Sequence, residues 1–473
     1  MSKIWGAFVA AAALSGLGCT AEPAAPVATC PDGNTIGGVC AGVPAGPLCD
    51  GDTCGDPSCS AVVVVGSDAE LTAALASAAP GTCVQLNPGA YLHALVPAGV
   101  KLLGKGADFV SLAALDLGAG SDSLVRGLTV SSDGITVSGQ NATIDAVRVT
   151  NASTDGITLA QGASATVSRS DVSGSARYAA AAFDVVSLHV ADSVLSGAKG
   201  PGLWAQCTGG CACTTPIDVT VSNTVIRDTK VVGLSLVGVN ATLDDVEISN
   251  NTVDDQFQPG GGLAVSGCST LTASGLSVHD NTNFGVLVDD SSASFHPSPD
   301  GMGLTVSNNL RGIWAQYIGQ SAQQSFTVDG ATVSGNTGIG IGIDGGSLNA
   351  SLSNCTVSNT ALVSLPALVH GVSAGAKDVG DGLNWLAVSQ LTIDGLTVSN
   401  SARASVLIDG PVAGGSSIAH VTLEGNDLAL GIVQQNLPQN GTQPAVGDAA
   451  PPIQSTTSEQ FPIAIGLGIP PEF

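Results

Sequence analysis

Residues 328–346 read VDGATVSGNTGIGIGIDGG, and this stretch decides the fold class of the chain. Its alternating glycines could belong to a phosphate-binding loop. A dinucleotide fingerprint, however, needs GxGxxG between a strand and a helix, with an acidic residue about 20 positions later. No helical pattern follows here, and the isoleucines of GIGIGID alternate as side chains on a β-strand do. We therefore interpret the stretch as two short strands joined by a turn.

Both halves of this stretch recur along the chain. ATIDAVRVTN, LTASGLSVHDN and LTIDGLTVSN resemble the first half, and GITVSG, GLWAQ, GLSLVG, GVLVDD and GIWAQ resemble the second. The leading glycines of the second group recur about every 22 or 23 residues, with insertions. So short a unit cannot bury a core alone, and its copies must stack. Leucine-rich repeats and propeller blades do not match this pattern or period, so we predict an all-β, single-stranded parallel β-helix of about twelve coils.

Two further features support a stacked fold. Residues 67–82, SDAELTAALASAAPGT, carry the one clear helix pattern, with a capping box formed by Ser67 and Glu70. Asparagine also recurs just after strands of the TVSN type. We expect these asparagines to point inward and to hydrogen bond from coil to coil. They are Asn281, Asn309, Asn336, Asn359 and Asn400.

The order of these features carries a resemblance. A helix is followed by CVQLNPGAY, then by GVKLLGKGAD, and then by the short coils. This order resembles the right-handed parallel β-helix superfamily of pectate lyases and related polysaccharide-active proteins, over about residues 61–435. The resemblance implies that the helix caps the open end of the solenoid. It implies no single activity, because the superfamily includes lyases, hydrolases, epimerases and non-catalytic surface proteins.

Composition restricts the possible partners. The chain has 473 residues, of which 62 are glycine, and 13 Lys and Arg stand against 38 Asp and Glu, for a formal charge of -25. A charge of this sign repels phosphate backbones and anionic membrane surfaces. We therefore expect no nucleic-acid partner. A polysaccharide or a component of the cell envelope is the expected partner, and we expect a monomer.

The N-terminus predicts export. Residues 1–19, MSKIWGAFVAAAALSGLGC, have a short apolar run followed by small residues, as in a secretory signal. Gly18 and Cys19 resemble a bacterial lipobox, in which the cysteine is lipidated; cleavage without lipid is the alternative. Membrane contact would then be through this lipid alone. We expect a protein of the cell surface or outer membrane, or a secreted one.

We expect four segments in the chain. After the signal at 1–19 comes a Cys-, Pro- and Gly-rich stalk at 20–60, then the β-helix at 61–435 and a Pro- and Gln-rich tail at 436–473. The stalk offers Asp50, Asp52 and Asp56 as oxygen ligands for Ca²⁺. The segment lacks the spacing and the terminal Glu of an EF-hand loop, so solvated acidic turns are the favoured alternative. No cofactor is otherwise required.

The twelve cysteines suit an oxidising compartment. Those of CTGGCAC, residues 207–213, are expected to form a loop disulfide rather than a metal site. Removing Cys19 leaves an odd number, and Cys355 is our candidate for a free, buried thiol.

Strand parity gives the candidate functional residues. In each strand the first and third residues after the glycine should face the core, and the second and fourth should face outward. Trp204 and Trp314 are then outward and could stack on sugar rings, beside Gln316 and the nearby cation Arg311. The alternative is that these tryptophans pack under neighbouring loops.

Carboxylates recur on the same face. Asp289, Gln316 and Asp344 occupy equivalent positions on three consecutive coils, and Asp290 follows directly. Two coils separate the aspartates by roughly 9 to 10 Å, near the upper end of the range for inverting glycosidases. Asp289, Asp290 and Asp344 are thus candidate catalytic residues. The alternative is that aspartate simply ends strands because it favours turns.

Two function classes remain. The first is a non-catalytic surface protein that binds polysaccharide or has a structural role. The second is a polysaccharide-cleaving hydrolase or lyase that uses these carboxylates. Polygalacturonase-type enzymes of the superfamily carry NTD, DD, GHG and RIK motifs, and this chain has no RIK equivalent.

Overall fold

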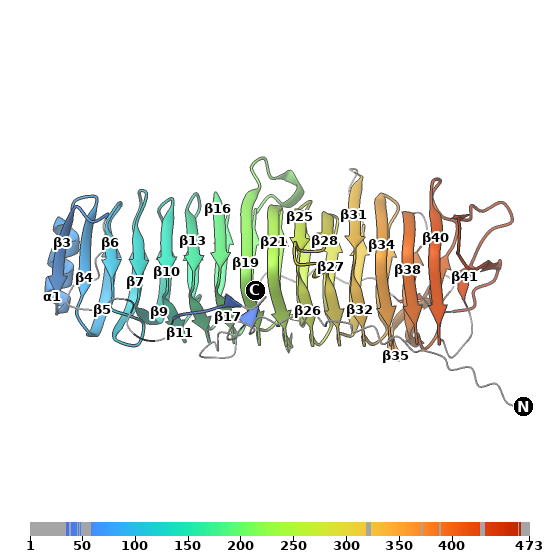
Figure 1. Cartoon of the computed structure of the whole chain (residues 1–473), viewed down its shortest axis with the longest axis horizontal. Helices are drawn as coiled ribbons and strands as arrows, with labels where there is room; N and C mark the ends of the chain where they lie inside the picture. Colours follow the sequence, from blue (N-terminus) through green and yellow to red (C-terminus); the bar gives the residue numbers. More distant parts are fainter. Residues whose placement is uncertain are drawn as a thin grey trace, which may run out of the picture.

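The computed structural model describes residues 35–36, 39–44, 46, 48, 58–317, 323–369, 372–386, 389–425, 431–461 and 463–464. In this part of the chain the strands stack into one long rod, and the polypeptide winds around a central core (Figure 1). Almost all strands pair in parallel with the strands one turn earlier and one turn later. This is the parallel β-helix that the repeats predict.

Each coil contributes strands to three faces of the rod, which we call sheets I, II and III. Sheet I contains β12 (Ile157–Leu159), β15 (Ala180–Phe183), β18 (Leu203–Gln206), β20 (Val232–Val237), β24 (Gly261–Ser266), β27 (Phe284–Asp289), β30 (Arg311–Gln316), β33 (Ile339–Asp344), β37 (Asp381–Leu386), β39 (Val406–Asp409), β41 (Ile432–Gln435) and β43 (Ile453–Ser455). Sheet II contains β3 (Ala61–Val65), β4 (Thr82–Leu86), β6 (Lys101–Leu103), β8 (Leu124–Arg126), β10 (Ala142–Asp145), β13 (Ser164–Ser168), β16 (Ser187–Ala191), β25 (Thr270–Ser274), β28 (Ser292–His296), β31 (Gln324–Asp329) and β42 (Ala445–Val446). Sheet III contains β11 (Arg148–Thr150), β14 (Asp171–Ser173), β17 (Val194–Ser196), β26 (Ser277–His279), β29 (Thr305–Ser307) and β32 (Thr332–Ser334).

Longer strands bend from one sheet into the next. Those that run from sheet III into sheet I are β5 (Gly89–Val96), β7 (Val110–Leu117) and β9 (Thr129–Val137). Those that run from sheet II into sheet III are β19 (Ile217–Arg227), β21 (Val239–Ser249), β34 (Leu348–Ser358), β38 (Gln390–Ser399) and β40 (Ser417–Glu424).

The rod has more coils than the sequence pattern indicates. Sixteen described strands follow one another along sheet II, from β3 to β42, which at ~4.8 Å per step gives a rod of roughly 70 Å. The extra coils lie at both ends, where the glycine-led pattern is weak. Because β42 and β43 still pair in parallel with β40 and β41, the coils also continue beyond the expected boundary at residue 435.

Alternation along each strand builds the core. In β27, Val286 and Val288 point into the central core, while Leu287 points out of the rod. The same parity holds on β30, where Ile313 and Ala315 are internal. Each buried Val or Ile contributes about 1.5–3 kcal/mol of transfer free energy, so the stacked aliphatic columns supply the main stabilisation.

The N-terminal helix forms as predicted. Helix α1 (Asp68–Ser77) begins after Ser67, whose hydroxyl accepts the backbone N–H of Glu70 at 3.4 Å, and the Glu70 carboxylate accepts the N–H of Gly66 at 2.7 Å. Its buried side chains are Leu71 and Leu75. The helix lies at the end of the rod, against the first coils (Figure 1).

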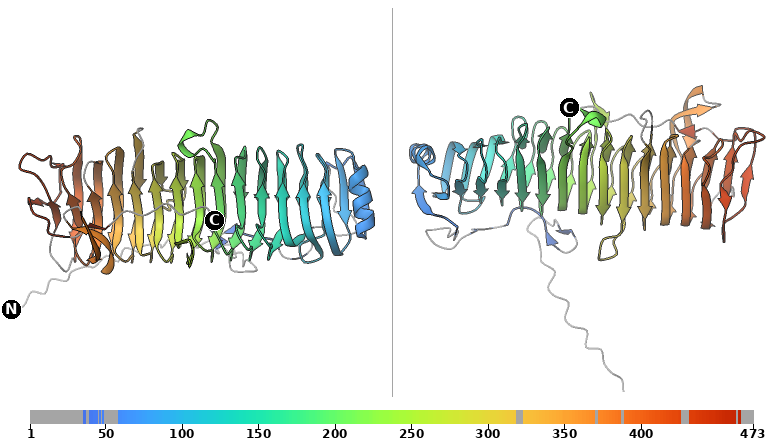
Figure 2. Two further views of the ribbon diagram at one scale, coloured as in Figure 1. Left: turned by 180° about the vertical axis from the view of Figure 1, so that it is seen from behind. Right: turned by 90° about the horizontal axis from the view of Figure 1, so that it is seen from above.

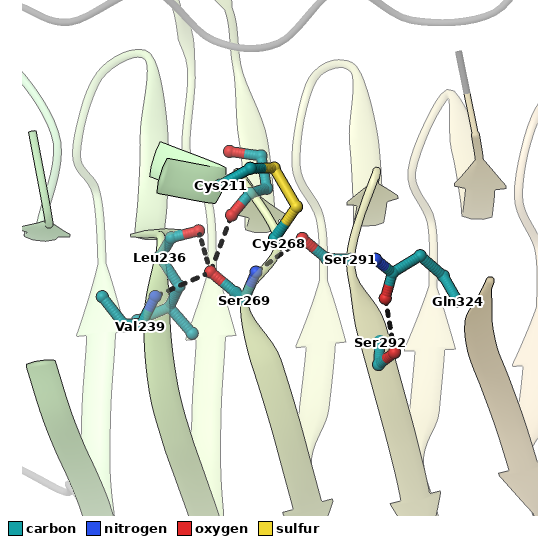
Figure 3. Close-up of a disulfide and its surroundings, with 9 residues drawn as sticks. Cys211, Leu236, Val239, Cys268, Ser269, Ser291, Ser292 and Gln324 are labelled. Carbon is teal, nitrogen blue, oxygen red and sulfur yellow. Dashed lines mark hydrogen bonds between the residues drawn. A yellow bond between two sulfur atoms is a disulfide. The ribbon is translucent and has the colours of Figure 1, made fainter. Parts of the chain in front are cut away.

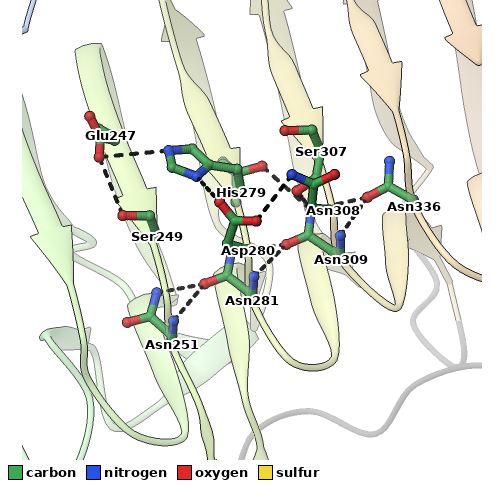
Figure 4. A network of polar contacts seen from close by, with 11 residues as sticks. Glu247, Ser249, Asn251, His279, Asp280, Asn281, Ser307, Asn308, Asn309 and Asn336 are labelled. Atoms are coloured by element: carbon green, nitrogen blue, oxygen red, sulfur yellow. Dashed lines mark hydrogen bonds and ion pairs between the residues drawn. The ribbon is translucent and has the colours of Figure 1, made fainter.

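Asparagines form a ladder along the inside of one corner, but its membership differs from the prediction. The side-chain oxygen of each asparagine accepts the backbone N–H of the previous one, at 3.0 Å from Asn251 to Asn281, 3.0 Å from Asn281 to Asn309 and 2.9 Å from Asn309 to Asn336 (Figure 4). Three of the predicted members are thereby confirmed, and Asn251 is an addition.

Asn359 and Asn400 were assigned to the ladder wrongly. Both have positive φ, 56° and 55°, and occupy the exposed turn position that Asn308 and Gly335 occupy in other coils. The ladder position is the next residue, and in these two coils it is held by Thr360 and Ser401, which are buried. The prediction failed by one residue because asparagine favours both the left-handed turn and the ladder.

Part of the expected stalk lies against the rod. The N–H of Gly42 donates to the carbonyl of Asp192 at 2.8 Å, and Ala41 packs on Val194 and Val225, which point outward from sheet III. Farther along, the N–H of Leu48 donates to the carbonyl of Lys105 at 3.0 Å. A small hairpin of β1 (Thr35–Ile36) and β2 (Val39–Cys40) precedes these contacts. The described part of this segment is therefore attached to the flank of the rod and is not a free spacer.

Two other hairpins project from the coils. One is β22 (Val253–Asp254) with β23 (Gln258–Pro259). The larger pairs β35 (Val363–Val369) with β36 (Val372–Val379), and β44 (Ile463–Ala464) adds to β35 in antiparallel fashion. Figure 2 shows the larger hairpin standing out from the rod, in orange in the right-hand view. Among the described helices, none is long and apolar enough to cross a membrane.

Three disulfides lie in the described region. Cys59 pairs with Cys83, Cys207 with Cys213, and Cys211 with Cys268. The second closes the CTGGCAC loop as predicted, and the third fixes that loop to the turn before β25 (Figure 3). Among the described cysteines, Cys355 is free and buried, and burial raises its pKa to about 11, as expected for an inert core thiol. The disulfides fit an extracytoplasmic protein.

Candidate functional site

The predicted residues do come together on sheet I. Asp289 pairs with Gln316 across β27 and β30, and Gln316 pairs with Asp344 across β30 and β33, so the three form one column along the rod. Trp314 lies on the same strand as Gln316 and points out of the core. The ring of Trp314 lies over Gly342, where an added Cβ would meet a ring carbon at 2.3 Å.

The tryptophans are covered, which corrects the expectation of exposed stacking surfaces. Trp204 is 2% exposed and Trp314 is fully buried, although both point away from the central core. Both belong to a second apolar cluster on the outside of sheet I. Leu365 and Val379 from the β35–β36 hairpin and Ile463 from β44 are part of this cluster. Neither indole face can stack on a sugar in this structure.

Hydrogen bonds explain the recurring WAQ motif. The indole N–H of Trp314 donates to Oε1 of Gln316 at 2.8 Å, and Trp204 makes the same bond to Gln206 at 2.7 Å. A buried indole N–H without a partner would cost about 1–3 kcal/mol. The glutamine two residues later therefore serves the tryptophan, and both are part of the packing of sheet I.

Asp289 is held in the same network. Nε2 of Gln316 donates to Oδ1 of Asp289 at 2.6 Å, and the aspartate is 1% exposed. Burial raises the pKa of Asp289 to about 6; the hydrogen bond from Gln316 opposes the shift and the charge of Asp290 adds to it. Such a carboxyl could exchange a proton near neutral pH, but it cannot reach a substrate in this structure.

The other two candidates are less enclosed. Burial also raises the pKa of Asp344, which is half-buried. Asp290 is half-buried in a turn with φ of 44°. Among the described residues, no group of three or more His, Cys, Asp or Glu side chains is placed to hold a metal ion.

Arg311 is not an exposed cation for an acidic sugar. It is 6% exposed, its guanidinium donates to Oδ1 of Asn283 at 3.1 Å, and its Nε is buried without a partner. Burial lowers its pKa to about 10. The four residues expected to bind substrate on sheet I, Trp204, Trp314, Gln316 and Arg311, are all buried, and the open surface lies elsewhere.

Sheet III carries a charged cluster that the sequence did not indicate. Nδ1 of His279 lies 2.7 Å from Oδ2 of Asp280, and Nε2 lies 3.6 Å from Oε1 of Glu247 (Figure 4). Glu247, together with Asp280, raises the pKa of His279 to about 9 against the effect of burial. The imidazole is thus protonated at neutral pH and acts as a fixed cation between two carboxylates, not as a base.

Sheet II presents the open polar surface. Its central outward positions align in register over eleven coils, and ten of the eleven residues carry a hydroxyl. We call them the threonine column: Thr143, Thr166, His189, Thr220, Thr242, Thr272, Ser294, Thr327, Ser351, Thr392 and Ser417. All are exposed or half-buried.

A hollow of about 350 Å³ lies at the middle of this column. Its polar lining comes from Thr220, Thr242, Thr270, Thr272 and Asn240, with Asp218 at one side. Within the described chain, none of the four threonine hydroxyls makes a hydrogen bond, so they are available to a ligand.

The disulfide-fixed loop stands at one end of the hollow. The CTGGCAC loop leads into β19 just before Asp218, and the disulfide to Cys268 holds it beside Thr270, the first residue of β25. In Figure 1 this loop rises above the neighbouring turns between β19 and β25. A recurring threonine flanked by apolar residues, as in ATI, ATV, VTV, ATL, LTA and LTI, is the sequence signal that could have identified the column.

Several predicted residues lie outside the described residues. They are Cys19, the candidate for lipidation, and Asp50, Asp52 and Asp56, the candidate calcium ligands.

The coil winding, the three parallel sheets and the capping helix define a parallel β-helix solenoid. The chain belongs to the right-handed β-helix family, whose model, described as a right handed beta helix region, matches residues 117–298 and 244–374. No curated protein matches the sequence.

Solved structures of similar architecture include enzymes. The catalytic unit of an α-1,3-glucanase from Streptomyces thermodiastaticus is 12% identical, with 89% of this chain and 73% of that chain covered and a TM-score of 0.44. The A-module of a mannuronan C-5 epimerase from Azotobacter vinelandii is 16% identical, covering 84% and 96%, with a TM-score of 0.34. A periplasmic alginate epimerase is 10% identical, covering 76% and 82%, with a TM-score of 0.34.

Proposed function

We propose that the protein is an exported β-helix rod that binds neutral polysaccharide along sheet II. The observation that carries the proposal is the hollow beside the disulfide-fixed loop, with four threonine hydroxyls that are free of intramolecular bonds. Hydroxyl and amide side chains both donate and accept hydrogen bonds, so they can pair with sugar hydroxyls. The side chains of the threonine column repeat every ~4.8 Å along the rod, which suits a polymer of repeating sugar units.

Charge selects the class of glycan. The hollow has Asp218 and no Lys or Arg in its lining, and the whole chain has a formal charge of -25. An acidic polysaccharide would be repelled, while a neutral one would not. We therefore expect laminarin, xylan, starch or galactomannan to be better ligands than alginate or pectin.

Affinity measurements on a double variant test this proposal. Thr242→Val with Thr272→Val keeps the side-chain shape and removes two hydroxyls from the hollow. At about 0.5–1.5 kcal/mol for each lost hydrogen bond, calorimetry or affinity electrophoresis should show roughly a 10-fold weaker interaction with the best neutral glycan. Thr305→Val on sheet III is the matched control and should bind like the wild type. Failure of the wild type to bind any glycan of the panel, or unchanged binding by the double variant, would reject the proposal.

Cleavage of polysaccharide is the second candidate function. The raised pKa of Asp289, about 6, is the observation in its favour, and the burial of Asp289 and Trp314 opposes it. An enzyme would release reducing ends from one glycan of the panel and lose this activity in Asp344→Asn. A binder would release none and would keep its affinity in that variant.

We also propose that export is followed by lipidation at Cys19. The lipobox-like sequence before Cys19 and the three disulfides support the placement outside the cytoplasm. Incorporation of labelled palmitate by the wild type and not by Cys19→Ala would support the lipid anchor, and equal labelling of both would contradict it.

A further inference from the structure

The N-terminal end of the rod concentrates exposed apolar side chains. Eleven large hydrophobic residues are exposed in the described chain, and six of them lie on or beside the first coils. On β3, Val62 is 51% exposed and Val64 is 48% exposed, and on β5, Leu92 is 71% exposed. Scattered exposed residues need no explanation, but a cluster at one end of a rod indicates a contact surface.

Strand β3 has an open edge at this end. It pairs in parallel with β4, and no other described strand pairs with it. Its sequence, AVVVV, has high β-propensity and contains no charge, proline or glycine. Four of its five residues are exposed, whereas Val65 is buried in the core together with Leu71 and Leu75 of helix α1. An open, apolar edge strand of this kind is a template for pairing with another strand.

An apolar cavity lies at the same end. It has a volume of about 450 Å³ and lies between α1 and the turns after β5 and β7, with Leu75, Leu95, Pro97 and Ala98 in its lining. The two acidic residues of the first turn of α1 are already engaged: Asp68 accepts the N–H of Leu92 at 2.7 Å, and Glu70 accepts that of Gly66 at 2.7 Å. His93, which also lines the cavity, is paired with Asp116 at 2.8 Å, so the charged groups named here already have partners within the chain.

The opposite end of the rod differs. Pro451 and Pro452 directly precede β43, which continues with the polar residues Gln454 and Ser455. Proline cannot donate to a neighbouring strand and so blunts an edge. The last described strand of sheet II is β42 (Ala445–Val446), which offers a two-residue apolar edge, whereas β3 offers five residues. Pairing of β3 with a second β3 therefore forms a longer apolar contact than head-to-tail pairing of β3 with β42.

We infer that two copies of this chain associate end to end, through antiparallel pairing of β3 with β3 of the partner. A run of valines is self-complementary in an antiparallel pair, and cross-strand β-branched pairs stabilise such a sheet. Because the contact is at the ends, it also keeps the acidic flanks of two rods with charge -25 apart. The assembly would be a closed twofold dimer, in contrast to the monomer expected from the sequence.

Analytical ultracentrifugation of the full chain tests this inference. The chain has a mass of 46.3 kDa, and the wild type should sediment with twice this mass at micromolar concentration. Val63→Glu places a charge at the centre of the pair and should halve the mass, with an unchanged far-UV spectrum because the site is exposed in one copy. Val446→Glu, on β42 at the opposite end and also exposed, is the matched control and should remain a dimer.

Cysteine cross-linking provides an independent measurement. Val63→Cys should form a disulfide between two copies under mild oxidation, because antiparallel pairing brings the two centres of β3 together, whereas Val446→Cys should not. A wild type that sediments at 46.3 kDa throughout the concentration range, or cross-linking by Val446→Cys alone, would overturn the inference.

Discussion

At the scale of single residues, sheet I shows how burial changes the role of a side chain. Trp314, Gln316 and Asp289 are joined by two hydrogen bonds and are excluded from solvent. The same three residue types on an open face would form a plausible sugar site. Here the indole N–H of Trp314 donates to Gln316. Burial disfavours the ionised form of Asp289, so its negative charge costs the folded state stability.

The first prediction concerns Asp289. Its folded pKa of about 6 lies above the ordinary value of 3.8, so its ionised form destabilises the folded state at neutral pH. Stability should therefore increase as pH falls through 6 toward 3.8. Asp289→Asn keeps an oxygen that can accept from Gln316 and removes the buried charge. Urea unfolding at pH 8 should show this variant more stable than the wild type by about 1–2 kcal/mol, and the difference should vanish near pH 4.

Asp300→Asn, on an exposed loop, is the control for the loss of one negative charge. If both variants change stability equally, the effect belongs to net charge and not to the burial of Asp289.

The sequence predicted which way the side chains of a strand point, but it did not predict which of them are exposed to solvent. The strand parity that places Leu287 and Trp314 outside the core was correct, since it depends only on alternation along a strand. Exposure was not predictable, because Leu365 and Ile463 join the apolar cluster that contains Trp314 from strands that lie far away in the sequence. Asn359 was placed wrongly because turn and ladder positions are adjacent in each coil and both accept asparagine.

At the scale of elements, sequence motifs predicted features formed by residues close together in the chain, but they did not predict contacts between distant segments. The capping box at Ser67 and Glu70 predicted the start of α1, and the CTGGCAC spacing predicted a loop disulfide. The bond from Cys211 to Cys268 joins a loop to a later coil, and cysteine spacing alone does not determine such pairings. The hollow on sheet II is lined by residues of β19, β21 and β25, and the recurring threonines of these strands are the sequence signal that was missed.

The second prediction concerns the charged cluster that joins β21 and β26. Glu247, with Asp280, raises the pKa of His279 to about 9, above the ordinary 6.5; Arg227 is the other charged group near Glu247. The stabilisation from protonated His279 is therefore complete below pH 6.5 and is lost as pH rises through 9. The stability difference between wild type and His279→Gln should be largest at pH 6 and should disappear near pH 10.

Chemical unfolding at both pH values measures this difference. His189→Gln, in the exposed threonine column, is the control for a histidine replacement on the rod. A difference between wild type and His279→Gln that is the same at pH 6 and pH 10 would show that the ion pairs with Glu247 and Asp280 contribute nothing.

At the scale of the whole molecule, the rod is a series of equivalent coils that hold different surfaces in fixed relation. The β35–β36 hairpin packs on part of sheet I, sheet II presents the threonine column, and the N-terminal end exposes β3. Each coil contacts mainly its two neighbours, so stability should be close to a sum of coil and interface contributions. The repeat period predicted this organisation, whereas the number of coils was underestimated where the end coils lack the leading glycine.

The last prediction follows from this modularity. Residues 277–304 form one coil, because Ser277 and Thr305 occupy equivalent positions on β26 and β29. Their deletion joins Leu276 to Thr305, lets Asn309 replace Asn281 in the ladder, and removes the buried Asp289. The shortened rod should fold, with a parallel-sheet circular dichroism spectrum and a single melting transition within a few degrees of the wild type. Deletion of residues 277–291 alone removes part of a coil, shifts sheet II out of register and should prevent folding. If the two deletions behave alike, the coils are not independent units, and the register of the rod must instead be set by contacts that span many coils.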